Sequence, residues 1–373
     1  MKYVLVDSEK NWTNFLPLTY LKPIGELRIG GTLLKEKWEK LLNEPIFTSG
    51  VHYLNTNNNE PHIAINSTVL PSIELVEELK NLRSGEQLIY NDTIIATFEN
   101  GSELIGRPSL TNCQFISSAI DLLDQINPQI ILDIENNKDK TFKSCEDNFT
   151  AVYQPQDIFI SSSATITNAT LDARHGPIYL GEDVCVHAGA IINGPAYIGD
   201  GTHVTSNTVI RGGFACGTSC VLGGEIKHVQ FQDYSHKGHY GYLGDSLVGS
   251  KCNFGAGTTS SNLKNNYSQI RVWNFSQQAI IDSGRTKLGL IMGDYTHTAI
   301  GSMLNTGTTI GLFANVFGQP PIPKFIEAFT WGVTGKYEWN KAVQLVSNLH
   351  NIKDIPLFEN ELDLLKSAYE FTD

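Results

Sequence analysis

The most regular pattern in the chain is a large apolar side chain that returns at every sixth position. Steps of six from Leu180 reach His228, and seven of these nine positions are aliphatic. A period of six matches neither the 3.6 residues of a helical turn nor the two-residue alternation of a lone strand. It is typical of a parallel β-helix, in which each hexapeptide forms one flat face and three hexapeptides close a triangular coil. We expect the aliphatic side chains to point inward and stack from coil to coil.

The repeat is interrupted between His228 and Tyr242, where the interval is fourteen residues instead of twelve. The interrupted region contains the sequence SHKGHYGYLGD, which is rich in histidine, glycine and tyrosine. On this spacing two extra residues are pushed out of the coil wall, so we expect SHKGH to project as a loop. His228 is predicted to point into the core, and Lys237 is predicted to face solvent.

The regions that flank the repeat have other periodicities. At the start, the strand KYVLV precedes two helical patterns, TLLKEKWEKLL and SIELVEELKNL, and then the strand-like LIYNDTIIATF. This alternation predicts an α/β unit. Near the end, EWNKAVQLVSNLH and FENELDLLKSAYEF have helical periodicity. The expected organisation is an α/β domain at 1–125, a polar linker at 126–158, a β-helix at 159–320 and a helical extension at 321–373.

The composition of the chain limits which binding partners and which cellular compartment we expect. The formal net charge of −12 argues against nucleic acid or an anionic membrane as the partner, although a local cluster of donors can still bind an anionic small molecule. No segment approaches the ~20 apolar residues of a membrane span, and the first apolar run, interrupted by Asp7, is too short for a signal peptide. The six cysteines form no CxxC pair. We therefore expect free thiols and a cytoplasmic protein.

A string of motifs within the repeat resembles a known family. The segments EIK, SHKGHYGYLGD and GAGT occur in the order found in the acetyltransferase half of the bifunctional UDP-N-acetylglucosamine pyrophosphorylase / glucosamine-1-phosphate N-acetyltransferases. This resemblance covers roughly residues 178–318. The N-terminal NFLPLTYLKPIGELRIGG also resembles the start of a sugar-nucleotidyltransferase domain. The whole chain is most similar to a divergent branch known from Bacteroidetes-type bacteria, with a shortened first domain. The implied fold is a Rossmann-like α/β domain followed by a left-handed parallel β-helix.

The resemblance implies acetyl-CoA-dependent N-acetylation of a hexosamine 1-phosphate in sugar-nucleotide synthesis. The sugar ammonium must lose a proton, and the resemblance places that role on His239, since histidine suits a base near neutral pH. It also implies that the backbone N–H of Ala256 stabilises the tetrahedral oxyanion.

Further binding residues follow from the same motifs. The resemblance assigns the sugar phosphate to Arg211, Lys227, Tyr242 and Asn253, and the cofactor to Ser302 together with Ala256. It assigns Asn262 to the cofactor or the sugar. One lysine of the family falls near Ser268, where this chain has none. The family also implies a homotrimer whose clefts between adjacent prisms hold the acyl donor.

The first domain departs from the family pattern. The usual glycine loop, L-A-A-G-x-G-T-R, holds nucleotide phosphates through its backbone N–H groups, but here the segment reads VDSEKNWTNF. Lys22 and Arg28 could still bind a nucleotide phosphate, and Asp7 or Asp92 could hold Mg²⁺ if the domain is active. Two alternatives to N-acetyl transfer therefore stay open. One is UTP- or dTTP-dependent nucleotidyl transfer, alone or alongside acetylation, and the other is a non-catalytic trimeric binding protein.

Overall fold

The computed structural model describes residues 2–55, 61–98, 104–137, 143–145, 147–319 and 321–372. The chain divides into two compact units, one formed by Met1–Leu27 and Thr32–Leu122, the other by Arg28–Gly31 and Leu123–Asp373. Three expected boundary residues, Met1, Pro320 and Asp373, and part of the expected linker lie outside the described residues. No helix in the described part of the chain has the length and apolar character to cross a membrane.

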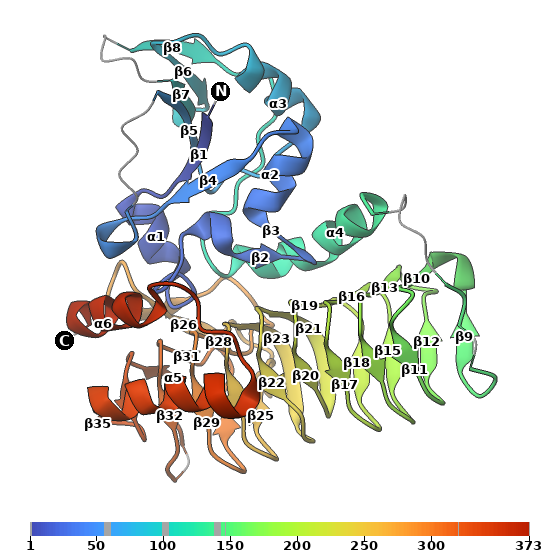
Figure 1. The fold of residues 1–373 in the computed structure, drawn as a ribbon. Coiled ribbons are helices and arrows are strands. Elements are labelled where there is room, and N and C mark those ends of the chain that lie inside the picture. Colours follow the sequence, from blue (N-terminus) through green and yellow to red (C-terminus); the bar gives the residue numbers. More distant parts are fainter. Residues whose placement is uncertain are drawn as a thin grey trace. The chain divides into compact units, whose positions relative to one another are not determined.

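The N-terminal unit is built on a mixed six-stranded sheet of order β4-β1-β5-β7-β6-β8 (Figure 1). β1 is parallel to both of its neighbours, whereas β7 runs antiparallel to β5 and β6. The strands are β1 (Lys2–Val6), β4 (Ile46–Ser49), β5 (His62–Asn66), β6 (Glu86–Tyr90), β7 (Thr93–Phe98) and β8 (Ile105–Pro108); the helices are α1 (Glu9–Phe15), α2 (Leu34–Leu42) and α3 (Ile73–Lys80), with the short η1 (Ile24–Glu26) and η2 (His52–Leu54).

Local sequence explains these elements. Leu34, Trp38 and Leu42 recur at spacing four and are fully buried, so they form the apolar face of α2. The helix ends at Asn43, which has a φ of 56°. The segment LIYNDTIIATF forms the hairpin β6–β7 instead of the single strand expected, because Asn91 and Asp92 adopt the left-handed conformation of a tight turn.

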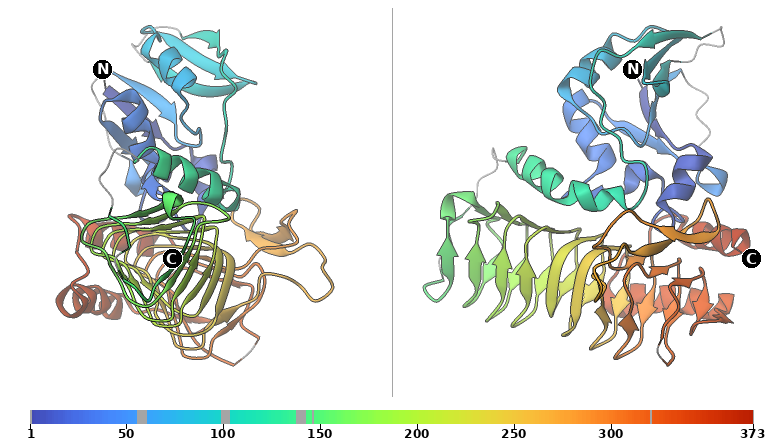
Figure 2. Two further views of the ribbon diagram at one scale, coloured as in Figure 1. Left: turned by 90° about the vertical axis from the view of Figure 1, so that its right-hand side faces the viewer. Right: turned by 180° about the vertical axis from the view of Figure 1, so that it is seen from behind.

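The C-terminal unit is a parallel β-helix, as predicted. Seen end-on in Figure 2, its strands stack as a prism with a triangular outline. Most strands belong to a thirteen-stranded and a ten-stranded sheet. The first half contains β9 (Ala151–Tyr153), β10 (Ile158–Ile160), β11 (Thr165–Ile166), β12 (Thr170–Asp172), β13 (Ile178–Leu180), β14 (Cys185–Val186), β15 (Ile191–Asn193), β16 (Ala196–Ile198), β17 (His203–Val204), β18 (Val209–Arg211), β19 (Phe214–Cys216), β20 (Val221–Leu222) and β21 (Glu225–Phe231), with η3 (Pro155–Asp157) before β10.

The second half continues the coil and adds a hairpin. Its coil strands are β22 (His236–Lys237), β23 (Tyr242–Val248), β24 (Asn253–Phe254), β25 (Thr259–Ser260), β28 (Ile291–Met292), β29 (His297–Thr298), β30 (Met303–Leu304), β31 (Thr309–Ile310), β32 (Asn315–Val316), β33 (Phe325–Ile326) and β34 (Thr330–Trp331); the hairpin is β26 (Arg271–Asn274) with β27 (Ala279–Asp282). The last strand, β35 (Gly335–Lys336), pairs antiparallel with β34. The helices α5 (Trp339–Lys353) and α6 (Glu361–Phe371) confirm the helical patterns of the C-terminal extension. Two short strands, β2 (Arg28–Ile29) and β3 (Thr32–Leu33), lie near the start of the chain.

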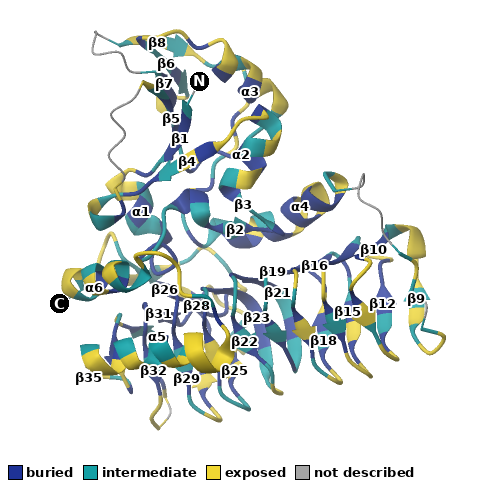
Figure 3. Ribbon diagram, viewed as in Figure 1, coloured by how far each residue is buried: buried dark blue, intermediate teal, exposed yellow. Residues whose placement is uncertain are grey.

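The strand register shows which side chains fill the prism. Leu180, Ile198 and Cys216 are successive partners in one column, and Val186, Val204 and Leu222 in another. Each is at most 2% exposed (Figure 3 shows the buried strands in dark blue). Removing these apolar side chains from water is the main stabilising contribution to the coil.

The interrupted region is shorter than an ordinary coil, so the expectation of a projecting loop is wrong. Cys216 pairs with Phe231, fifteen positions later instead of eighteen, and Ile210 pairs with Ile226. The inward positions belong to Ile226 and Leu243.

The shortening occurs at two corners, the turns that join adjacent faces. Only four positions separate Leu222 from Ile226, and five separate Ile226 from Phe231, where six is normal. From Lys237 to Leu243 the normal spacing of six returns. His228 therefore lies at a corner with a φ of 56°, and Tyr242 points outward.

One outer face of the coil is covered by segments from elsewhere in the chain. The helix α4 (Asp121–Glu135) begins at the end of the expected α/β domain and occupies part of the expected linker. The four residues Arg28–Gly31, here called the strap, are held by side chains of α4 and the coil. Gly31 N–H donates to Asp133 of α4 at 2.8 Å, and a Cβ at Gly31 would lie 2.3 Å from the Tyr197 ring, so the strap needs glycine there.

Candidate functional site

His239 lies on an exposed corner between β22 and β23. The next corners stack directly against it, since Gly257 N–H donates to Tyr240 O at 3.1 Å and Gly301 N–H donates to Ala256 O at 2.8 Å. His239, Ala256 and Ser302 therefore follow one another along the same edge of the prism. This edge joins the predicted base, the predicted oxyanion donor and one predicted cofactor residue.

The two cofactor candidates on this edge differ in what they can offer a ligand. The backbone N–H of Ala256 has no acceptor within the described residues, so it can donate to a bound group. The hydroxyl of Ser302 instead donates to Ala299 O at 2.8 Å, and the residue is 8% exposed. Ser302 thus stabilises its own turn.

A polar cluster begins three residues after His239, on the face formed by β18, β21 and β23. Tyr242 pairs with Glu225, and Lys227 pairs with Gly244. Arg211 Nη1 donates to Glu225 Oε1 at 2.7 Å, with both side chains about half exposed at 50% and 42%. Burial, with the nearby carboxylates of Asp245 and Glu225, raises the pKa of Tyr242. The structure therefore brings Arg211, Lys227 and Tyr242 together.

Asn262 joins this cluster through a hydrogen-bond network. Its amide donates to Asp245 Oδ2, and Asp245 Oδ1 lies 2.8 Å from His228 Nδ1. The other ring nitrogen of His228 lies 3.0 Å from Leu123 O. Burial raises the pKa of Asp245, but the hydrogen bonds from His228 and Asn262 lower it more, so it stays below its usual value. Both ring nitrogens of His228 thus lie within hydrogen-bond distance of oxygen atoms, which fixes the orientation of the ring.

Asn253 lies elsewhere. It is exposed in β24 of the ten-stranded sheet, between His236 and His297. Burial lowers the pKa of His297 to about 4, so this ring is neutral at physiological pH. Within one chain, Asn253 is therefore on a different face from Tyr242.

The candidates in the first part of the chain are dispersed. Lys22 lies before η1, and Asp92 is exposed at the β6–β7 turn. Arg28, in the strap, is paired with Asp233 at 2.9 Å and donates to Gly31 O at 2.6 Å, so its guanidinium is already bound.

Asp7 is the buried candidate of the N-terminal unit. It follows β1 directly and accepts Ile24 N–H at 3.1 Å. Ser49 and Ser67 stand at the ends of β4 and β5, the strands on either side, so the three residues share the carboxyl edge of the parallel strands. Burial raises the pKa of Asp7 to about 6, and the neighbouring Ser67 hydroxyl and the hydrogen bond from Ile24 N–H offset only part of that effect. Ligands of open α/β sheets bind at this edge.

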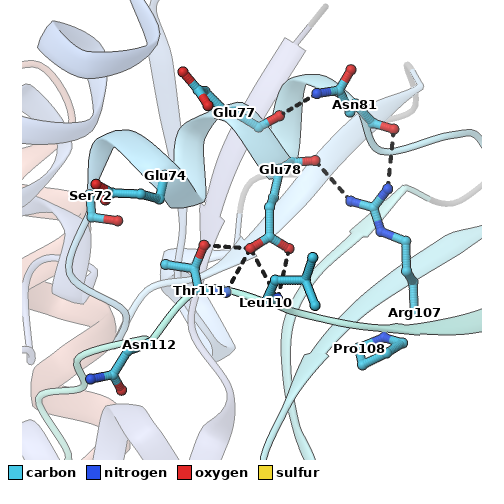
Figure 4. Close-up of a pocket in the computed structure, with 10 residues that line it drawn as sticks. All are labelled: Ser72, Glu74, Glu77, Glu78, Asn81, Arg107, Pro108, Leu110, Thr111 and Asn112. Atoms are coloured by element: carbon cyan, nitrogen blue, oxygen red, sulfur yellow. Dashed lines mark hydrogen bonds between the residues drawn. The ribbon is translucent and has the colours of Figure 1, made fainter.

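The N-terminal unit also contains an open pocket of about 810 Å³ beside α3 (Figure 4). Glu78 points toward the loop after β8, where its carboxylate accepts Thr111 N–H at 2.8 Å, Leu110 N–H at 3.2 Å and the Thr111 hydroxyl. Arg107 donates to Glu78 O at 3.0 Å. These groups bind one another, so they build the wall of the pocket. The other lining residues are Ser72, Glu74, Glu77, Asn81, Pro108 and Asn112.

Three participants in the C-terminal site were not identified from the sequence. Asp245 is not among the sequence candidates, and the prediction that His228 points into the core is wrong, because His228 lies at a corner. The prediction that Lys237 faces solvent is also wrong, because Lys237 is 2% exposed. The signal that could have found Lys237 is its place six residues before Leu243, the apolar residue that actually fills the next inward position. In the described part of the chain, no group of three or more His, Cys, Asp or Glu residues is placed to hold a metal.

The N-terminal part of the chain is similar to a known protein family. Residues 3–170 match the family model of sugar nucleotidyl transferases. This part of the chain is therefore similar to that family. The matched residues run beyond the expected domain end at 125 and include the first strands of the coil, β9 to β11.

Two curated proteins are 34% identical to the chain over 93 residues. One is a bifunctional sugar-1-phosphate nucleotidylyltransferase/acetyltransferase of Sulfurisphaera tokodaii, and the other is the bifunctional protein GlmU of Methanocaldococcus jannaschii. Each match covers 25% of this chain and 23% or 22% of the relative, so less than a quarter of either relative is spanned. Both relatives are bifunctional proteins, like the family that the motifs resemble.

Proposed function

We propose that the chain is an acetyl-CoA-dependent N-acetyltransferase that acts on a hexosamine 1-phosphate. The observation that carries this proposal is the adjacency of His239 and Ala256, on stacked corners, to the polar cluster that starts at Tyr242. The proposed base and oxyanion donor lie on one edge of the prism. The cationic and amide side chains that would bind a phosphorylated sugar lie on the adjoining face, which β23 enters at Tyr242, three residues after His239. The name of one curated relative, a bifunctional sugar-1-phosphate nucleotidylyltransferase/acetyltransferase, supports acetyl transfer.

In this mechanism the sugar phosphate binds to Arg211 and Lys227. The Arg211–Glu225 pair is exposed and is worth at most about 1 kcal/mol, so a phosphate can compete for the guanidinium. Tyr242 and Asn262 hold the sugar, and Asp245 fixes the direction of the Asn262 amide. This arrangement orients the amine toward the exposed corner.

His239 then accepts a proton from the amine, which attacks the thioester carbonyl of acetyl-CoA. The Ala256 N–H donates to the oxyanion that forms, and collapse of the intermediate expels the CoA thiolate. Asn253 lies on another face and can reach the substrate only from a neighbouring copy. The proposal therefore includes a homotrimer whose clefts complete the site.

The test is release of free CoA thiol with glucosamine 1-phosphate as acceptor. His239→Ala should lower kcat by about 10² to 10⁴-fold, the usual contribution of a general base. The matched control is His203→Ala, since His203 is another exposed histidine of the coil, in β17 of the ten-stranded sheet. Turnover by His239→Ala equal to that of the control would contradict the assignment.

Sugar-1-phosphate nucleotidyl transfer is the second candidate function. The family match over residues 3–170 and the position of Asp7 at the carboxyl edge of the sheet favour it. A buried carboxylate oxygen suits Mg²⁺, with the remaining ligands supplied by nucleotide phosphates and water. Pyrophosphate release from UTP or dTTP with a sugar 1-phosphate and Mg²⁺ tests it. Asp7→Asn should abolish the release and Asp92→Asn should not, whereas no release from the wild type with any common nucleotide would exclude it.

A further inference from the structure

Lys237 is a buried cation inside the prism, directly below the His239 corner. It is the register partner of Leu222, so it occupies an inward position that apolar residues fill in the preceding coils. The residue is 2% exposed. Burial lowers the pKa of its ammonium group to about 8. A lysine placed where leucine or valine would contribute hydrophobic stabilisation must be retained for a specific contact.

The ammonium group makes two contacts, both with backbone oxygens at corners. Nζ donates to His239 O at 3.0 Å and to Gly223 O at 3.0 Å. Gly223 belongs to the corner that has lost two residues, and a Cβ there would lie 2.5 Å from Gly238, so the two corners touch. Lys237 therefore ties the shortened corner to the next one from the inside.

The His239 corner is held from two directions. The carbonyl of His239 points inward to Lys237, while the carbonyl of Tyr240, one residue later, accepts Gly257 N–H at 3.1 Å along the coil axis. With both peptide groups fixed, the His239 side chain projects outward and the Ala256 turn is set beside it. Displacement of a catalytic group by about 1 Å can lower a rate about 100-fold.

We propose that Lys237 is a positioning residue that holds the corner carrying His239 in register with the Ala256 turn. It acts from inside the coil and touches no substrate. This inference rests on the proposed acetyltransferase function, in which His239 is the base. It adds a residue that serves the reaction through the backbone.

The test compares Lys237→Met with Lys251→Met. Lys251 is a second buried lysine of the same prism, 4% exposed, whose partners are Glu361, Tyr295 and Pro356 O. Both variants lose a buried ammonium group, but only Lys237→Met frees the His239 corner. We expect kcat of Lys237→Met to fall about 10- to 100-fold with KM for either substrate within twofold, while Lys251→Met loses stability and keeps kcat.

Hydrogen exchange provides a readout that does not need turnover. In Lys237→Met the amides of residues 238–241 and 255–257 should exchange at least about tenfold faster, as expected for opening that is local to these corners. Lys251→Met should leave them unchanged. If the wild type acetylates no acceptor but this difference is seen, the proposed function fails and the positioning role stands.

Other outcomes would overturn the proposal. Wild-type kcat in folded Lys237→Met, or unchanged exchange at both corners, contradicts it directly. If Lys237→Met does not fold, Lys237→Gln retains N–H donors on a shorter side chain and should recover part of kcat. If neither variant folds, Lys237 is a folding residue and the proposal is wrong.

Discussion

Asp7→Asn is expected to stabilise the N-terminal unit at neutral pH. The folded unit raises the pKa of Asp7 from 3.8 to about 6 because the carboxylate is buried. At 1.36 kcal/mol per pKa unit, the ionised side chain costs about 3 kcal/mol at pH 7. Asparagine keeps the acceptor for Ile24 N–H and removes the charge, so it should recover up to about 3 kcal/mol.

The stabilisation by Asp7→Asn should depend on pH, and the direction of that dependence follows from the raised pKa of Asp7. Between pH 4 and 6 the folded protein binds more protons than the unfolded chain at this site, so stability falls as pH rises through that window. The gain from Asp7→Asn should therefore be absent near pH 4 and complete by pH 7. The assay is urea unfolding followed by the fluorescence of Trp12 and Trp38, which are both buried in the N-terminal unit.

Asp92→Asn is the matched control, because Asp92 is exposed in a turn that asparagine also favours. It should change the urea midpoint little at any pH. A loss of stability in Asp7→Asn at pH 7, or an equal gain at pH 4 and pH 7, would refute the reasoning. Stabilisation of the wild type by Mg²⁺ that is absent in Asp7→Asn would in turn support the nucleotidyl-transfer candidate.

Three further predictions concern the C-terminal unit. Glu361→Gln should lower the free energy of unfolding by about 3–5 kcal/mol, because it leaves the buried ammonium of Lys251 without its carboxylate; thermal unfolding measures this, and Glu338→Gln, at an exposed pair, should have almost no effect. Arg211→Ala should raise KM for the sugar phosphate about tenfold or more with kcat retained, if its contact is made equally in the ground and transition states; steady-state kinetics tests this, and an unchanged KM would contradict the phosphate role. Phe231→Ala should cost about 3–5 kcal/mol, because a fully buried ring leaves a cavity between coils; a loss below 1 kcal/mol would show that the coil collapses around it.

The β-helix could be predicted because its signal is local and repeated. Each inward position from Leu180 to Leu222 is apolar at the same spacing, so the sequence directly encodes the register. The motifs likewise identified Arg211, Lys227, Tyr242 and Asn262 as candidates, and these four residues lie on one face of the folded coil.

The irregular coil could not be read in the same way. A fixed step of six places His228 and Tyr242 inside, but the shortened corners give those positions to Ile226 and Leu243. The burial of Lys237 depends on two carbonyl oxygens that only the folded corners bring together. Such contacts depend on turn lengths, and an apolar period carries no information about them.

The same limit applies to the covered face of the coil. Nothing in the sequence RIGG connects it with side chains two hundred residues later, yet Gln230 and Gln232 accept N–H groups of Gly30 and Arg28 at 2.8 Å. The strand order of the mixed sheet could not be predicted either, since a segment that reads as one strand forms the two antiparallel strands β6 and β7.

The position of the strap in the sequence affects how the chain folds while it is being synthesised. A ribosome synthesises Arg28 about two hundred residues before Asp233, its ion-pair partner, which at 5–20 residues per second is a delay of roughly 10–40 s. Coils can stack one upon another as they emerge, but the strap has no complete surface to bind until β21 has left the exit tunnel. A nascent chain arrested before that strand should therefore leave the strap accessible to protease, and a coil expressed without residues 1–31 would never acquire this cover.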